Sequence, residues 1–157
     1  MAVSAGGQVF AASPSRGVLL TIPAPGAQGD RSATGPDAVA AQSVELDALR
    51  GARNVQVSAV GDTPVLLLDH ARVLVPGNDP VALPEQDEKA RLQQPSSDGV
   101  QALVATSRNL YRVPLSGADP VRATSKGGLE PSSPVQAGGC GYAVWSGAPR
   151  LATGSLE

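Results

Sequence analysis

The chain has 157 residues, of which 41% are hydrophobic and only 3% aromatic, and its formal net charge is −2. Its 12 basic and 14 acidic residues are scattered singly, so no positive field gathers phosphates and nucleic acid is not an expected partner. No apolar run approaches the roughly 18 residues of a membrane span, and we expect residues 1–157 to form one domain excised from a larger protein.

The first predicted element is a hairpin between Gln8 and Ile22. Two short apolar runs are separated there by a turn that contains Pro14 and Gly17. Proline presets φ and glycine permits positive φ, so this spacing favours a tight antiparallel turn. Residues 23–42 are rich in Pro, Gly, Ala and Ser without a hydrophobic period, which predicts a long loop.

The next segment allows two interpretations. Asp37 and Gly51 are suitable caps for a helix between them. Alternatively, Val44 and Leu46 alternate with polar residues as in a strand, and the alternation resumes at Val55. We favour the strands, because the alternation leads directly into the regular pattern that follows.

From Val65 onward, short apolar runs follow one another at regular spacing. They lie at residues 65–69, 72–75, 80–83, 101–106, 109–115 and 119–123. Strands of this length with loops this short are antiparallel neighbours. The polar segment 84–91 predicts a solvated outer loop, with one helical turn as the alternative.

A sequence pattern of two apolar runs around a polar turn, followed by Pro or Gly, recurs about every 38 residues. Its copies lie at Gln8–Gly26, Pro64–Gly77, Val100–Gly117 and Gly139–Gly154. Such self-similarity indicates units that bury their apolar faces on one another. We therefore predict an all-β fold, a β-propeller or propeller fragment of about four antiparallel units, with a two-sheet β-sandwich as the alternative. If the propeller is incomplete, a homodimer would cover its ends.

Three of these segments, GDTPVLLLDHARVLVPG, LVATSRNLYRVPLSG and GGCGYAVWSG, support a family resemblance. They resemble the propeller-type repeat region of actinobacterial exported proteins that often carry fibronectin type III modules. The resemblance covers residues 55–147, and no fibronectin type III module is recognisable in the chain. It implies an extracytoplasmic scaffold, secreted or anchored through other regions, with no family active site to carry over.

Residues suited to catalysis are few. His70 is the single histidine, no nucleophile-elbow motif occurs, and the spacing places His70 at an exposed turn. One Cys and one His cannot form a zinc site, and the chain has no calcium-loop or phosphate-loop motif, so we expect no metal and no cofactor. We expect no catalytic residue and no enzyme activity, with a hydrolase built from scattered Asp and Ser residues as the remaining alternative.

Cys140 allows three interpretations. It is a buried apolar filler, one half of a disulfide whose partner lies outside this chain, or a reactive nucleophile. We favour the filler, because no histidine or cationic cluster lies near it in sequence to lower its pKa.

Three aromatic residues, Trp145, Tyr142 and Tyr111, are the candidate ligand-surface residues. Side-chain alternation along a strand places Tyr142 and Val144 on one face, and Trp145 with Ala143 on the other. We favour Trp145 as a packing element between sheets. If Trp145 is exposed, it is instead a platform for stacking a sugar.

These observations predict a non-enzymatic β-repeat scaffold or binding module of an exported, cell-envelope-associated protein. The expected partner is a protein or a cell-envelope polysaccharide. The alternative function is a non-catalytic carbohydrate-binding accessory module of a polysaccharide hydrolase.

Overall fold

Apolar runs separated by Gly and Pro fold into strands throughout the chain. The computed structural model describes residues 1–24, 41–125, 130–146 and 152–155. Within these residues the fold is all-β, with 47% strand and 5% helix.

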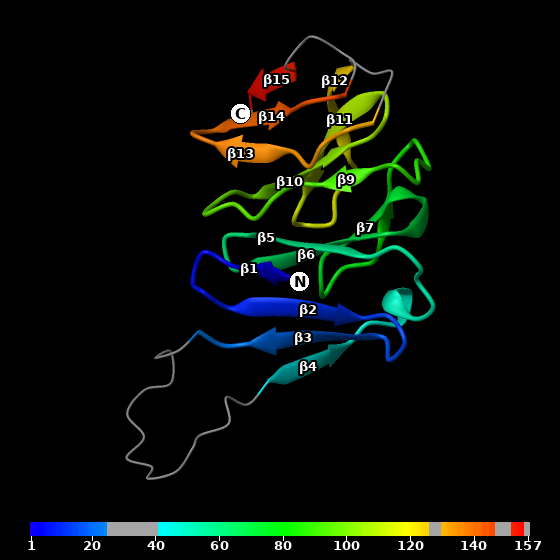
Figure 1. The fold of residues 1–157 in the computed structure, drawn as a ribbon, viewed down its shortest axis with the longest axis vertical. Coiled ribbons are helices and arrows are strands. Elements are labelled where there is room, and N and C mark those ends of the chain that lie inside the picture. Colours follow the sequence, from blue (N-terminus) through cyan, green and yellow to red (C-terminus); the bar gives the residue numbers. More distant parts are fainter. Residues whose placement is uncertain (25–40, 126–129, 147–151, 156–157) are drawn as a thin grey trace.

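The strands form four antiparallel sheets whose strand order follows the chain (Figure 1). The first sheet contains β1 (Ala2–Val3), β2 (Val9–Ser13), β3 (Val18–Ile22) and β4 (Gln42–Glu45). The second contains β5 (Gln56–Val60), β6 (Thr63–Leu68), β7 (Arg72–Leu74) and β8 (Val81–Ala82). The third contains β9 (Arg91–Leu92), β10 (Gln101–Ala105), β11 (Asn109–Pro114) and β12 (Val121–Ser125). The fourth contains β13 (Val135–Ala137), β14 (Cys140–Ala143) and β15 (Ala152–Ser155).

The predicted N-terminal hairpin is confirmed by the pairing of β2 with β3, in which Ser13 lies opposite Val18. Gly17 in the turn has a φ of 67°, which glycine adopts without strain. Strands are also the correct choice for the ambiguous segment, because β4 and β5 form there and only the short 3₁₀ helix η1 (Asp47–Leu49) lies between them. Most of the loop predicted at 23–42 lies outside the described residues, although its last residue, Gln42, already belongs to β4.

The polar segment 84–91 forms no helix, so the alternative of one helical turn is wrong. It connects the second sheet to the third and ends in β9. The described helices, η1 and η2 (Asp69–Ala71), have three residues each, and no described helix is long and apolar enough to cross a membrane.

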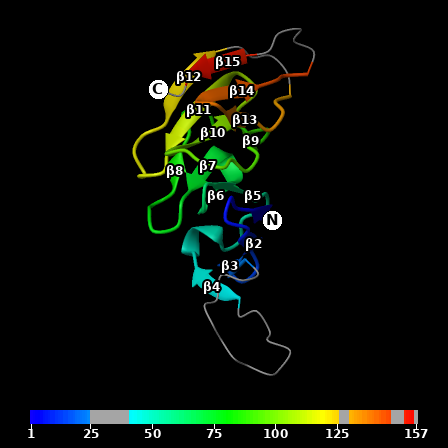
Figure 2. The same ribbon diagram turned by 90° about the vertical axis from the view of Figure 1, so that its left-hand side faces the viewer.

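The four sheets pack on one another in chain order, with the first at one end of the long axis and the third and fourth together at the other, where β12 lies beside β15 (Figures 1 and 2). In the order of packing, the first sheet lies at one end of this stack and the fourth at the other. Between the first three sheets, the close approaches involve the leading strands, because β1 and β2 contact β5, and β5 and β6 contact β9. No strand of the fourth sheet pairs with the first among the described residues, so the stack is open.

The second sheet is buried on both faces, as alternate residues of β6 show. Val65 and Leu67 belong to a hydrophobic cluster shared with the third sheet, whereas Leu66 and Leu68 belong to one shared with the first sheet. All four side chains are at most 3% exposed. The unbroken apolar run of β6 therefore reflects a strand with a sheet packed on either side.

The third sheet repeats this arrangement along β10. Ala102 and Val104 pack toward the second sheet, and Leu103 and Ala105 pack toward the fourth sheet together with Trp145. The core of the protein consequently consists of three thin layers between four sheets.

Replacing Leu103 by Ala removes a fully buried side chain from the layer between the third and fourth sheets. We expect the free energy of unfolding to fall by about 2–5 kcal/mol, because the lost burial is combined with a cavity between two sheets that cannot collapse freely. Denaturant unfolding followed by circular dichroism measures the loss.

The control for this experiment is Val121→Ala, since Val121 is 49% exposed on β12. Its effect should stay within about 0.5 kcal/mol. Equal losses for the two variants would contradict the assignment of Leu103 to a buried layer.

Candidate functional site

A cavity of about 510 Å³ lies at the end of the second sheet. Its walls come from the loop that enters β5, from the turn η2 and from the connection between the second and third sheets. His70, Asp69, Asp87, Arg53 and Glu88 are among its lining residues, so the cavity gathers the single histidine and several charged groups. It is the place at which catalytic chemistry has to be tested.

His70 occupies the middle of η2, and its predicted position at an exposed turn is confirmed. Its φ of 58° and the φ of 52° at Ala71 are unusual for residues other than glycine. Within the described residues, no hydrogen bond joins the His70 ring to a carboxylate. Among the described residues, the His70 ring thus has no carboxylate hydrogen-bonded to it of the kind that orients the histidine of a catalytic triad.

Asp69, beside His70, anchors the backbone. Its Oδ2 accepts a hydrogen bond from the Arg53 N–H at 2.7 Å, and its Oδ1 accepts one from the Asn54 N–H at 2.8 Å. These two bonds hold the pKa of the Asp69 carboxyl below its ordinary value of 3.8. The carboxylate thus fixes the loop that enters β5 against the turn after β6.

Gln56 lines another wall of the cavity and connects two sheets. Its Nε2 donates to the Ala90 carbonyl at 2.8 Å, and its Oε1 accepts from the Leu92 N–H at 2.9 Å. The side-chain amide thereby takes the place of a neighbouring strand and links β5 to β9.

The connection between the second and third sheets is tied to the turn after β10 by Glu85. Thr106 Oγ1 donates to Glu85 Oε2 at 2.6 Å, and Asn109 Nδ2 donates to the other carboxylate oxygen. Most residues of segment 84–91 are exposed, as predicted for an outer loop, but Glu85 fastens it to Thr106 and Asn109, which are 0% and 6% exposed. Burial, together with the nearby negative charge of Glu85, raises the pKa of Tyr111 above its usual value.

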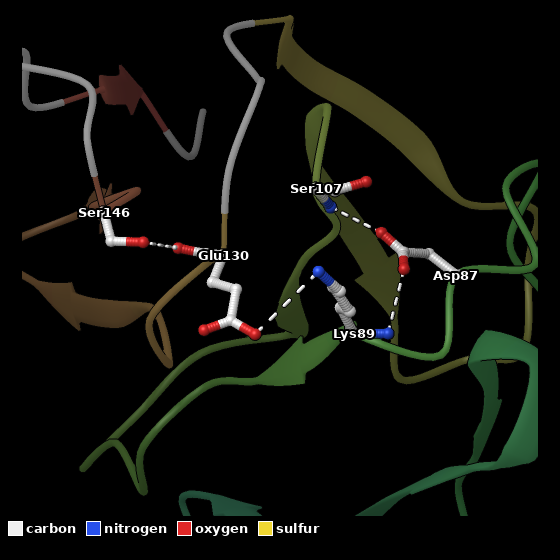
Figure 3. A network of polar contacts seen from close by, with 5 residues as sticks. All are labelled: Asp87, Lys89, Ser107, Glu130 and Ser146. Atoms are coloured by element: carbon white, nitrogen blue, oxygen red, sulfur yellow. Dashed lines mark hydrogen bonds and ion pairs between the residues drawn. The ribbon is translucent and has the colours of Figure 1, made fainter.

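Asp87 continues this polar network toward the fourth sheet (Figure 3). Its carboxylate accepts hydrogen bonds from the N–H of Ser107 at 2.6 Å and of Lys89 at 2.8 Å. Burial opposes ionisation, but the hydrogen bonds from Ser107 and Lys89 outweigh it and lower the pKa of Asp87. Lys89 Nζ lies 3.9 Å from Glu130, whose carbonyl accepts from the N–H of Ser146 at 3.0 Å.

Sequence reasoning missed a buried amide cluster between the third and fourth sheets. Gln93 is 3% exposed, accepts a hydrogen bond from the Leu103 N–H at 2.6 Å and donates one to Ser96 Oγ at 3.1 Å. Gln136 donates both to Gln93 Oε1 and to the Gln101 carbonyl, the latter at 2.8 Å. The local sequence around Gln93 indicates only a turn, because two partners of the amide, Leu103 and Gln136, lie 10 and 43 residues farther along the chain.

Burial agrees with the packing role that we favoured for Trp145, and it removes both Trp145 and Tyr111 as ligand-surface residues. Trp145 is 1% exposed and packs between the third and fourth sheets, and its Nε1 donates to the Thr106 carbonyl at 2.7 Å. Tyr111 is 4% exposed within the layer between the second and third sheets. A buried ring offers no face for stacking a ligand, so only Tyr142, which is half-buried on β14, remains accessible.

Cys140 begins β14 and has a free thiol. It is half-buried, so the prediction of a buried apolar filler is wrong. Its partner in the pairing with β13 is Ala137, which is exposed.

No group of three or more His, Cys, Asp or Glu side chains suited to a metal ion occurs in the described part of the chain. Comparison of the chain with protein-family models, with curated proteins and with solved structures finds no significant match. A proposal for the function therefore depends on how the residues of this chain are arranged.

Asp69 should make the stability of the protein depend on acid. Because its folded-state pKa lies below the unfolded value, its contribution is present above about pH 4 and is lost as the pH falls through the folded pKa. Asp69→Asn should therefore be less stable than the wild type at pH 7, and the difference should shrink toward pH 2. Thermal unfolding from pH 7 to pH 2 measures it, with the exposed Asp119→Asn as the control.

Trp145 is the only tryptophan and reports directly on its own burial. We expect its fluorescence to be protected from acrylamide in the folded protein and to become accessible in denaturant. Trp145→Phe removes the donor to the Thr106 carbonyl and should lower the free energy of unfolding by about 1–3 kcal/mol. Equal quenching of the folded and unfolded chains would show that the indole faces solvent.

Proposed function

We propose that this chain is a non-enzymatic scaffold made of repeated β units, an arc of β-propeller blades that serves as a binding module in an exported, cell-envelope-associated protein. The observation that carries the proposal is the use of its polar side chains. Several polar side chains form hydrogen bonds that fasten loops and strands to one another, namely those of Asp69, Gln56, Glu85, Asp87 and Gln93.

The stacking geometry favours a propeller arc over a two-sheet sandwich. In a sandwich each sheet covers its partner with one face only, whereas here the second and third sheets are covered on both faces. Propeller blades pack face to face in this way around a shared axis.

The leading edges of the sheets give further support. The Ala5 N–H donates to the Gly61 carbonyl at 3.1 Å, the Gly61 N–H donates to the Ser96 carbonyl at 2.9 Å, and the Gln94 N–H donates to the Pro134 carbonyl at 2.8 Å. Each of these backbone bonds joins a segment near the first strand of one sheet to the next sheet. Linked leading edges are what a central propeller axis requires.

The hydrogen bonds of the carboxylates in the cavity at His70 favour a role in binding over a role in catalysis. Two of the carboxylates that line it, Asp69 and Asp87, already accept two backbone hydrogen bonds each. A carboxylate held in this way orients structure and is a poor proton acceptor, because the hydrogen bonds stabilise its charged form.

A protein component of the cell envelope is the partner that we favour. Burial of Trp145 removes the indole as a sugar-stacking platform and leaves Tyr142 to support the polysaccharide alternative. The extracytoplasmic location and the link to fibronectin type III proteins rest on the sequence resemblance.

Co-sedimentation with purified actinobacterial cell envelope tests this function. We expect saturable binding that is lost when the envelope is treated with protease and is kept after digestion of its glycans. His70→Ala should bind as the wild type does, because the scaffold has no step that needs an imidazole.

Absence of saturable binding would overturn the proposed function. Soluble sugar or peptide that the wild type releases with time and His70→Ala does not would instead establish an enzyme. Loss of binding after glycan digestion would select the polysaccharide alternative, and Tyr142→Ala would then be the variant to examine.

A further inference from the structure

The outward face of the first sheet is apolar over β1, β2 and β3, while Ser43 and Glu45 of β4 lie at its edge, and it has no neighbouring sheet among the described residues. Register fixes which residues share it, since Val3 pairs with Val9, Val9 with Ile22, and Ala11 with Leu20. Val3 is 52% and Ile22 38% exposed. The opposite face of the same strands carries Phe10 and Leu19, which pack on the second sheet.

The outward face of the fourth sheet, at the other end of the stack, is also apolar over β13 and the end of β14. Val135 pairs with Tyr142, and Val144 lies two residues farther along on the same side. Val135 is 42% and Val144 46% exposed. Ala143, on the other side of β14, is 2% exposed and packs on the third sheet.

These two faces are complementary in the order of the stack. Each interior sheet covers the following sheet with one face and the preceding sheet with the other. The first sheet lacks a preceding neighbour, and the fourth lacks a following one. The first sheet could therefore be covered by the outward face of a fourth sheet, and the fourth sheet by the outward face of a first sheet.

We propose that a second copy of this chain supplies both neighbours: the outward face of the fourth sheet of each chain packs on the outward face of the first sheet of the other, closing a ring of eight sheets. The proposal rests on the propeller arrangement given under the proposed function. It extends that arrangement, because each contact between chains repeats the contact between successive sheets within a chain.

The area of such a contact decides between a ring and a simpler dimer. With strands of about five residues, a rise of about 3.4 Å per residue and a strand spacing of about 4.8 Å, one contact of three to four strands buries roughly 500 Å² over both partners. A stable interface needs about 1,000 Å². A dimer joined through one end alone falls short, whereas the two contacts of a closed ring reach this size.

Head-to-tail contacts between copies close into a ring or continue into a filament, depending on the rotation between successive copies. The linked leading edges of the sheets indicate a rotation about a common axis. A closed pair of chains also leaves no apolar end face exposed to water.

Light scattering on the purified 157-residue chain tests the proposal. We expect a mass twice the 15.8 kDa of one chain, independent of concentration. Val3→Glu and Val144→Glu each place a charge on one outward face, and each should halve the mass. Val100→Glu is the matched control, because Val100 is 79% exposed but precedes β10 of the third sheet and lies on neither outward face. The Val100→Glu variant should keep the mass of the dimer.

Mixing the two monomeric variants provides the decisive measurement. The Val3→Glu chain keeps an intact fourth sheet and the Val144→Glu chain an intact first sheet, so the mixture should recover one contact and form a heterodimer at high concentration. A dimer joined by two identical faces would respond to only one of the two variants and would gain nothing from mixing. Circular dichroism and Trp145 fluorescence verify that each variant is folded.

A monomeric wild type, a mass that grows continuously with concentration, or sensitivity to only one of the two variants would overturn the ring. Envelope co-sedimentation separates this failure from that of the proposed function. A monomer that still sediments overturns the ring alone, whereas a dimer of the expected mutational pattern that does not sediment supports the ring and overturns the function.

Discussion

Burial of both faces of the second and third sheets is the constraint on which the rest of the structure depends. A strand with one wet face alternates apolar and polar residues, but Val65 to Leu68 are four consecutive buried aliphatic residues. Each pair of neighbouring sheets shares one layer made mostly of Val, Leu and Ala side chains with a single aromatic residue, so a chain with 3% aromatic residues fills its interior through three thin layers. The loss of any one sheet would expose a face of the next, and the stack therefore depends on every layer.

Two-sided burial also explains the placement of the polar groups. Because the sheet faces are occupied by apolar contacts, the backbone groups of the connecting segments have to be satisfied at the sheet edges. Gln56 does this between β5 and β9, Gln93 satisfies the Leu103 N–H within the third sheet, and Gln136 of the fourth sheet donates to the Gln101 carbonyl of the third. Glu85 and Asp87 fasten the 84–91 segment to the turn after β10 in the same way. The acidic side chains of this protein thus contribute to its architecture, and acid should weaken it where their hydrogen bonds depend on the charged form.

Local pattern was enough to predict the all-β fold and most of the longer strands, because apolar runs and their Gly and Pro boundaries are properties of neighbouring residues. The two-residue strands β1, β8 and β9 are too short to show any period. The tie from Glu85 to Thr106 spans 21 residues, and that from Gln56 to Ala90 spans 34, so neither leaves a trace in the local sequence. Alternation correctly places Trp145 on the face of Ala143, but whether that face is covered depends on the third sheet, which the residues around Trp145 do not specify.

The edges of the sheets are protected against pairing with further strands, whereas the outward face of the first sheet is not protected against packing. The last strand of the first sheet, β4, is four residues long, fully exposed, and carries Gln42, Ser43 and Glu45, which discourage pairing with another strand. The last strand of the second sheet, β8, has only two residues and offers little to pair with. Over the outward face of the first sheet, by contrast, Val3, Val9, Ala11, Leu20 and Ile22 form an apolar surface, and the charged Glu45 shares this face only at its β4 edge. A chain with protected strand edges and an apolar sheet face is suited to association through packing of sheets on one another rather than through addition of strands. Packing of sheet faces is also what holds its own four sheets together.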